Sequence, residues 1–169
     1  MRARFGRRAR PAAEPRRSSA HPAPPVRTAA KNQPVTVLDV VTIDDVADMA
    51  LALPEVTEGE RHGNRGWSVL GKTFAWERPF SKADIKRFGD AKPPDGPIVA
   101  VRMADLGEKE AVLAANSKAF FTIPHFDGYP AVLIQLSKVT KKAMREALVD
   151  GWLACAPPTL ADEFANKRM

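Results

Sequence analysis

Hydrophobic residues recur with helical spacing in two stretches of the chain. After Thr42 they return every three or four positions until Pro54, and a second stripe of this kind runs from Thr140 to Cys155. Thr42 followed by Asp45 is a capping-box signature, and a proline pair ends the second stripe. The pattern predicts two amphipathic helices. Their predicted inward residues are Ile43, Val46, Ala47, Ala50, Leu51 and Leu53 in the first, and Met144, Ala147, Leu148, Trp152 and Cys155 in the second.

The same start signal recurs at three other places, where a capping residue is followed three positions later by an acid. These places predict further helices. The first of them should end at Gly89 after Ile85 and Phe88 have packed inward. The three pairs are Ser81 with Asp84, Asp105 with Glu108, and Thr159 with Asp162.

Short strand-like segments lie between these helices. Glycine-bearing turns, HGNRG and LGK, join the first three segments and predict consecutive antiparallel hairpins. Helices segregated from antiparallel strands define an α+β fold, with a sheet of hairpins packed against N- and C-terminal helices. The predicted strands span 57–62, 66–70, 72–77, 97–103 and the two arms of 120–136.

Residues 1–34 differ in composition from the rest of the chain. They hold six prolines and nine basic residues against one acid, which predicts a disordered tail followed by a folded domain at 35–169. The remainder carries 17 basic and 19 acidic residues, so the net charge of +6 comes from the tail. The tail is Arg-rich, which is typical either of a specialised arm or of sequence upstream of the natural start. Candidate starts are Val35, Val37 and Val41.

Cysteine content and hydropathy bear on the compartment. Cys155 is the single cysteine, which excludes an intramolecular disulfide, and it occupies a core position of its helix. No apolar run approaches the roughly 18 residues of a membrane span. The prolines of residues 1–34 disfavour the amphipathic helix that an organelle transit peptide needs, so we do not expect the tail to be such a signal. We therefore expect a cytoplasmic protein with no membrane partner.

The segment TIPHFDGYPAVLIQL places three reactive side chains between two apolar arms. His125 could act as a general base, Asp127 could orient it, and Tyr129 could donate to an oxyanion. The alternative is a structural turn, in which Gly128 is the candidate for a residue at positive φ. Either a protein-interaction site or a small-ligand site could use this loop, and an enzyme ranks behind both.

Several segments together resemble the MmcQ/YjbR family of small bacterial proteins. They are MALALPEVTEGERHG, KTFAW, TIPHFDGYPAVLIQL and GWLACAPPTL, and the match covers residues 43–165. The resemblance implies a CyaY-like α+β fold with two projecting hairpins, the double wing, and from that shape a DNA-binding function. The chain departs from the family at Gln135, Pro158 and Thr159, where many relatives carry basic residues. Loss of cations weakens phosphate binding.

The hairpins supply the residues that we predict to contact nucleic acid. Arg and Asn bind phosphates or base edges, and His62 or Trp67 could stack on an unpaired base. The alternative is that these are polar turn residues and that Trp67 lies in the core. The predicted contacts are Arg61, His62, Asn64, Arg65, Trp67, Lys72 and Arg78.

Other chemistries have little support in the sequence. His62 and His125 could bind a metal with Asp127 or Glu60, but they lack the local spacing of metal ligands. The chain contains no GxGxxG, no GK[ST] and no GxSxG motif. We therefore assign no catalytic residue, metal or cofactor. DNA is the partner that the resemblance suggests, and the sequence does not identify a protein partner for the interaction alternative.

Overall fold

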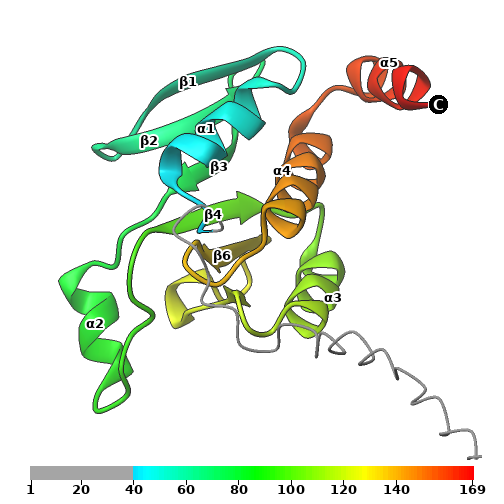
Figure 1. The fold of residues 1–169 in the computed structure, drawn as a ribbon. Helices are drawn as coiled ribbons and strands as arrows, with labels where there is room; N and C mark the ends of the chain where they lie inside the picture. The colour runs from blue at the N-terminus through cyan, green and yellow to red at the C-terminus, as the bar shows by residue number, and fades with distance from the viewer. Residues whose placement is uncertain (1–39) are drawn as a thin grey trace, which may run out of the picture. The chain divides into compact units, whose positions relative to one another are not determined.

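The computed structural model describes residues 40–169, which form a six-stranded antiparallel sheet with helices packed on it (Figure 1). The strand order is β1-β2-β3-β4-β6-β5, and this arrangement confirms the predicted α+β class. The predicted tail and the domain boundary at residue 35 lie outside the described residues. The elements are α1 (Ile43–Leu51), β1 (Val56–Arg61), β2 (Asn64–Val69), β3 (Lys72–Glu77), α2 (Lys82–Phe88), β4 (Ile98–Arg102), α3 (Leu106–Ala115), β5 (Phe120–Phe121), a 3-10 helix (Pro124–Phe126), β6 (Ala131–Gln135), α4 (Lys141–Cys155) and α5 (Pro158–Arg168).

The capping box predicted for α1 is present. The Thr42 hydroxyl accepts from the Asp45 N–H at 3.1 Å, and the Asp45 carboxylate accepts from the Thr42 N–H at 2.9 Å. These bonds satisfy two backbone donors that a helix start leaves free. The helix buries Val46, Ala47 and Ala50. The prediction was wrong for Leu51, which is 45% exposed because it lies at the last turn of the helix, beyond the covered stripe.

The other predicted helix starts had mixed outcomes. Ser81 and Asp84 form a complete capping box, and α2 ends at Gly89 with a φ of 57°. Ile85 was predicted to pack inward but is 50% exposed. The predicted cap at Thr159 was wrong, because α5 begins at Pro158, which puts Pro157, two residues earlier, at the cap position without a side-chain hydrogen bond. Proline is well suited to a first helical position, since its fixed φ is already helical and it has no N–H to satisfy.

The predicted capping box at the start of α3 is only partly formed. Asp105 accepts from the Glu108 N–H at 2.8 Å, as expected for a cap. The Glu108 carboxylate, however, accepts from the N–H of Ala104 rather than from that of Asp105. The helix start is therefore satisfied by a shifted version of the predicted box.

The two faces of the sheet carry separate apolar clusters. The larger cluster joins the sheet to α1 and α4, and all five residues predicted to face inward from α4 are buried in it. The smaller one lies on the opposite face, where Trp76, Ala100 and Leu133 pack with Phe126 of the 3-10 helix. Figure 1 shows α4 crossing one face of the sheet. The other face is left to α2 and the loop after β5.

Helix α4 approaches the sheet closely at Gly151. A Cβ atom there would lie 2.6 Å from Val101 Cγ1, 3.1 Å from the Arg102 carbonyl oxygen and 3.2 Å from the Phe74 carbonyl oxygen. Two of these neighbours are backbone atoms, which cannot rotate away. Phe74 is the extra residue of a bulge between β2 and β3, where Trp67 pairs with Ala75 and Ser68 pairs with Thr73. Only glycine fits this contact without a backbone shift.

Two-residue turns connect the first three strands. His62 and Gly63 have φ values of 53° and 80°, and Leu70 and Gly71 have values of 46° and 84°. Two successive left-handed residues are the requirement of a type I′ hairpin turn. The glycine-bearing hairpins predicted from the sequence are therefore confirmed.

The last predicted hairpin has a different form. Its first arm, β5, contains only Phe120 and Phe121, and the connection to β6 includes a 3-10 helix instead of a tight reversal. Gly128 has a φ of 72°, as the sequence predicted. In the described residues no helix is both long and apolar enough to cross a membrane.

Candidate functional site

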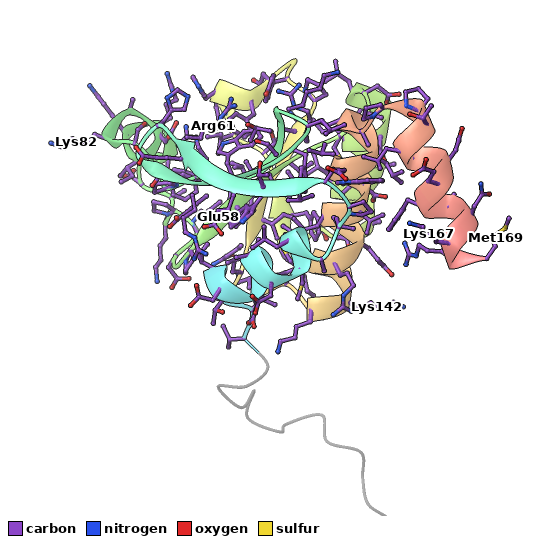
Figure 2. The ribbon with its side chains drawn as sticks, turned by 90° about the horizontal axis from the view of Figure 1, so that it is seen from above. Glu58, Arg61, Lys82, Lys142, Lys167 and Met169 are labelled. Carbon is purple, nitrogen blue, oxygen red and sulfur yellow. The ribbon has the colours of Figure 1, made fainter. Side chains whose placement is uncertain are left out.

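The predicted nucleic-acid contacts separate onto the two faces of the sheet. Arg65 lies on the face that carries α1, where it donates to Glu58 and, at 2.8 Å, to Asp44 Oδ1. Arg61 lies on the other face, and Figure 2 shows it and Glu58 on opposite sides of the β1 ribbon. The hydrogen bond from Arg65 lowers the pKa of Glu58, which keeps this pair ionised. Two carboxylates thus compensate the charge of Arg65.

Two other predicted contacts lie away from any common surface. Trp67 is fully buried in the larger cluster, so the prediction that it could stack on a base was wrong. Its side chain lies on the face of β2 that α1 and α4 cover. Lys72 begins β3 beside Val69, at the far end of the strand from Arg78. The two ends of the six-residue strand β3 are five steps apart, which corresponds to roughly 16 Å along an extended strand.

Three of the remaining candidates, Arg61, His62 and Arg78, converge with the loop that the sequence singled out separately. They line a hollow of about 330 Å³ between the end of the first hairpin and the 3-10 helix. We call this the hairpin–loop hollow. None of its lining residues is acidic. They are Arg61, His62, Trp76, Arg78, His125, Phe126 and Tyr129.

Arg61 is the least compensated cation of this hollow. Its guanidinium lies over the Trp76 ring, 4.6 Å from the ring centroid. Gly66 leaves room for it, since a Cβ on Gly66 would contact the Arg61 Cβ at 3.4 Å. Arg61 has no ion pair among the described residues, and its buried Nε has no hydrogen-bond partner there. Its charge is therefore available to a ligand.

Arg78 is held by a network next to the hollow. It donates to the Pro79 carbonyl and, at 2.9 Å, to Asp84 Oδ2, and its guanidinium lies 5.7 Å from the Phe126 centroid. Burial opposes the ionisation of Asp84, but hydrogen bonds from Ser81 and Arg78 outweigh it and lower the pKa of this carboxyl. Arg78 thus connects β3, α2 and the loop, and Asp84 compensates much of its charge.

The loop residues do not form the catalytic relay that the sequence analysis considered as an alternative. His125 is exposed at the rim, and no hydrogen bond joins it to Asp127 within the part of the chain that the structure describes. The Tyr129 hydroxyl accepts from Arg102 Nη2 at 2.8 Å. The tyrosine is therefore fixed in place by an arginine that the sequence did not single out. Asn64, another predicted contact, donates to the His62 carbonyl and stabilises the turn.

Lys109 of α3 positions this loop and was missed in the sequence. Its ammonium donates to the carbonyl oxygens of Phe126 at 2.7 Å and Tyr129 at 2.9 Å. Burial lowers the pKa of Lys109, and the charge of Asp127 opposes that effect. A sequence pattern could have indicated its position. Lys109 lies three and four residues before Val112 and Leu113, and this helical spacing places it on the side of α3 that packs against the core.

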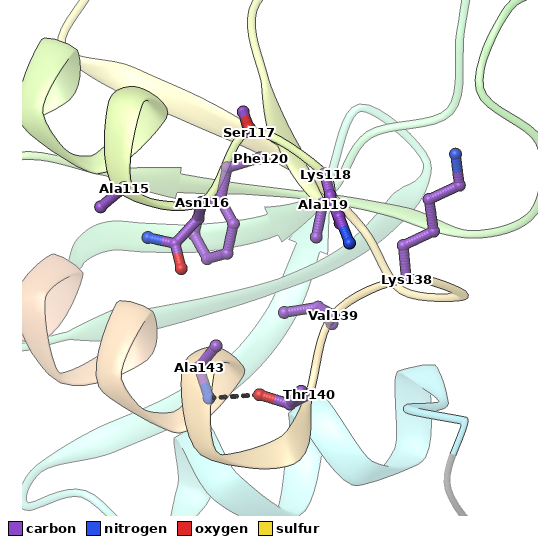
Figure 3. Close-up of a pocket in the computed structure, with 10 residues that line it drawn as sticks. All are labelled: Ala115, Asn116, Ser117, Lys118, Ala119, Phe120, Lys138, Val139, Thr140 and Ala143. Atoms are coloured by element: carbon purple, nitrogen blue, oxygen red, sulfur yellow. Dashed lines mark hydrogen bonds between the residues drawn. The ribbon is translucent and has the colours of Figure 1, made fainter. Parts of the chain in front are cut away.

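A second hollow lies between the end of α3 and the start of α4 (Figure 3). It measures about 320 Å³, and Lys118 and Lys138 are its charged lining residues. Both lysines are exposed, and none of the predicted site residues lines this hollow. It therefore lacks the fixed cation and the group of rings found in the hairpin–loop hollow.

The metal site considered in the sequence analysis is not formed by the described residues. His62 and His125 do line the same hollow, but neither Asp127 nor Glu60 joins them there. Across residues 40–169 no group of three or more His, Cys, Asp or Glu side chains is placed to hold a metal ion. The hollow therefore presents cationic and aromatic groups.

Comparison with known proteins places the chain among mycobacterial relatives. It is 41% identical over 128 residues to the uncharacterized protein Rv2570 of Mycobacterium tuberculosis H37Rv and to the uncharacterized protein Mb2600 of Mycobacterium bovis. Each alignment spans 74% of this chain and 96% of the relative. The chain belongs to the same protein family as these proteins. No family model matches it, and no solved structure does. The resemblance to the MmcQ/YjbR family stays a prediction.

Proposed function

We propose that this protein is a non-enzymatic binding module that holds a small anionic ligand in the hairpin–loop hollow. One observation supports this proposal above all: the charge of Arg61 is uncompensated. Arg61 lines a concave surface without acidic lining residues, and it has no ion pair among the described residues. The proposal develops the small-ligand alternative for the loop around His125. It combines this loop with Arg61 and Arg78, which the sequence analysis had predicted to contact nucleic acid.

The geometry of Arg61 suits an anion. A guanidinium that stacks on a ring with its face can still donate from its N–H edge, and that edge matches carboxylate and phosphate groups. A concave site with one sign of charge also concentrates the potential at its centre. The volume of about 330 Å³ lies at the lower end of the range of small-molecule sites.

The same observations give less support to duplex DNA as the ligand. Phosphate-backbone affinity grows with the number of uncompensated cations on one surface. Arg65 and Arg78 are paired with carboxylates, and Lys72 lies at the far end of β3. DNA binding by the hairpins remains a prediction that rests on the family resemblance.

A titration of the full chain with inorganic phosphate tests the proposal. NMR signals of the His62 and His125 rings report on the hollow, so binding elsewhere on the chain does not obscure the result. Arg61→Gln should weaken the affinity at the hollow about tenfold or more, since a hydrogen bond to a charged group contributes about 1.5–3 kcal/mol.

The matched control is Lys72→Gln, which removes the same charge from the same sheet at a distant position. It should change the affinity by less than about twofold, because exposed charges farther apart than a Debye length are largely screened. Equal effects of the two substitutions, or no phosphate-induced change at either histidine, would contradict the proposal.

A further inference from the structure

The two walls of the hairpin–loop hollow differ in chemistry, and from this difference we infer the ligand class. Resting on the proposed function, we propose that the ligand is a nucleoside phosphate. Its phosphate lies on the strand wall near Arg61, and its base lies against the rings of the loop wall. Such a molecule has a compact anionic end and a planar aromatic end, as the two walls require.

The strand wall provides the charge. Arg61 and His62 come from the end of β1 and its turn, and Arg78 follows β3. A phosphate monoester presents three acceptor oxygens, so it can accept from the guanidinium edge of Arg61 and from an imidazole N–H at once. A carboxylate can accept from both donors as well, but it carries a single negative charge, whereas a phosphate monoester carries about −1.5 to −2 at neutral pH and so interacts more strongly with the cations of this wall.

The loop wall provides the rings. Phe126 lies 5.7 Å from Tyr129 and 6.0 Å from His125 between ring centroids. Trp76 at the base is 5% exposed and already covered by Arg61, which leaves the more accessible His125 and Tyr129 to contact a base. Stacking on aromatic side chains accepts any base, because every base has a π face.

Contacts within the protein hold the loop backbone and Tyr129 of this wall in place. Arg102 holds the Tyr129 hydroxyl and lies 5.5 Å from its ring centroid, and Lys109 bonds two backbone carbonyls of the loop. Rings that are already ordered lose little conformational entropy when a base binds to them. A preformed aromatic wall opposite an uncompensated arginine is thus explained by a ligand that has both parts.

Four probes added to the full chain at constant ionic strength test this inference. They are inorganic phosphate, ribose phosphate, adenosine monophosphate and adenosine, each followed at the His62 and His125 rings by NMR. Adenosine monophosphate should bind about tenfold more tightly than ribose phosphate, because only the nucleotide stacks. Tyr129→Leu should remove this preference, so that the ratio of the two affinities approaches one.

His125→Ala provides a second variant, since its exposed side chain can be removed without disturbing the loop hydrogen bonds. It should also reduce the preference, with the His62 ring as the remaining reporter. Equal binding of adenosine monophosphate and ribose phosphate would overturn the nucleoside inference and leave the anion-binding function standing. Absence of phosphate binding at the hollow would overturn both.

A final comparison tests whether the bound ligand is a free nucleotide or the terminal nucleotide of a single-stranded nucleic acid. A short oligodeoxyadenylate with a terminal phosphate is compared with adenosine monophosphate. Equal affinity indicates the free nucleotide. Affinity more than tenfold tighter, and still sensitive to Arg61→Gln and Tyr129→Leu, indicates a strand end, because further phosphates and bases then add contacts. Both results support a nucleoside phosphate as the bound chemistry.

Discussion

The guanidinium of Arg61 lies 4.6 Å from the ring centroid of Trp76, across β2 from its own strand. The contact passes over Gly66, whose missing side chain lets an arginine from the edge strand reach a tryptophan two strands away. Stacking of this kind contributes about 0.5–2 kcal/mol and restricts the guanidinium to one orientation. The positive charge of the hairpin–loop hollow is thereby held in place.

Gly151→Ala should destabilise the protein. An Ala Cβ would lie 2.6 Å from Val101 Cγ1 and close to two carbonyl oxygens, and overpacking of this kind costs about 1–3 kcal/mol. That cost opposes the gain of about 1 kcal/mol that alanine normally brings to a helix. The free energy of unfolding in urea measures the difference.

Gly107→Ala in α3 is the control, because its closest neighbour is Asp105 Oδ1 at 3.2 Å, a side-chain atom that has to shift by only a few tenths of an ångström and can keep its hydrogen bond to the Glu108 N–H. It should leave the protein as stable or make it slightly more so. A Gly151→Ala protein of wild-type stability would show that α4 can move off the sheet at little cost.

Gly128→Val should cost about 1–3 kcal/mol of stability because Gly128 has a φ of 72° and valine strongly disfavours this region. Space is not the cause, since nothing lies within 4 Å of the added Cβ. His125→Gln should cost much less, since the His125 side chain is exposed. Thermal melts compare the two. A folded Gly128→Val protein beside an unfolded His125→Gln protein would reverse our interpretation of the loop.

Leu70→Asn should stabilise the β2–β3 hairpin. Leu70 has a φ of 46° and is 57% exposed, so it is strained and contributes little burial. Asparagine tolerates left-handed backbone and favours this turn type, which gives an expected gain of about 0.5–1 kcal/mol. Leu70→Val should have the opposite sign, because β-branched residues disfavour positive φ. Chemical denaturation of both variants provides the measurement.

Asp84 should make the stability depend on pH in acid. Burial raises its pKa, but hydrogen bonds from Ser81 and Arg78 dominate and place the folded-state pKa below the ordinary value of 3.8. The stabilisation is therefore complete above about pH 4 and is lost as the pH falls through the folded-state pKa. Asp84→Asn should remove this loss, and it should also lower stability at neutral pH by about 3 kcal/mol, since Arg78 loses its charged partner.

Unfolding curves collected at a series of acidic pH values measure this effect. Asp90→Asn is the control, since Asp90 is exposed and forms no ion pair among the described residues. Its curves should follow those of the wild type throughout. An Asp84→Asn protein with an unchanged acid limb would mean that other carboxyl groups control the acid transition.

Local signals in the sequence predicted much of the fold. The capping boxes at Thr42 and Ser81 and the glycine turns at Gly63 and Gly71 involve neighbours within a few residues, so the chain itself specifies them. The contact of Gly151 with the sheet was not predictable in the same way, because its three partners belong to strands far away in sequence.

The candidate site was only half predictable for the same reason. Five of the seven lining residues, all but Trp76 and Phe126, were named from the sequence and assigned to two separate functions, since residues 61 and 125 meet only after β1 and the loop pack on one face. Alternation along the strand could have separated Arg61 from Glu58, yet nothing local showed that Asp44 would compensate Arg65. Lys109 was overlooked because a lysine on a helix usually faces solvent.

The sheet ends on one side with β5, which is only two residues long, and on the other with β1, whose outer residues include Glu58 and Glu60. An unpaired strand edge is a template on which another chain can add a strand. The short edge offers too few backbone groups for that, and the longer one carries the charged side chains of Glu58, Glu60 and Arg61, which oppose the addition of another strand. The protein should therefore resist fibrillar self-association even at high concentration.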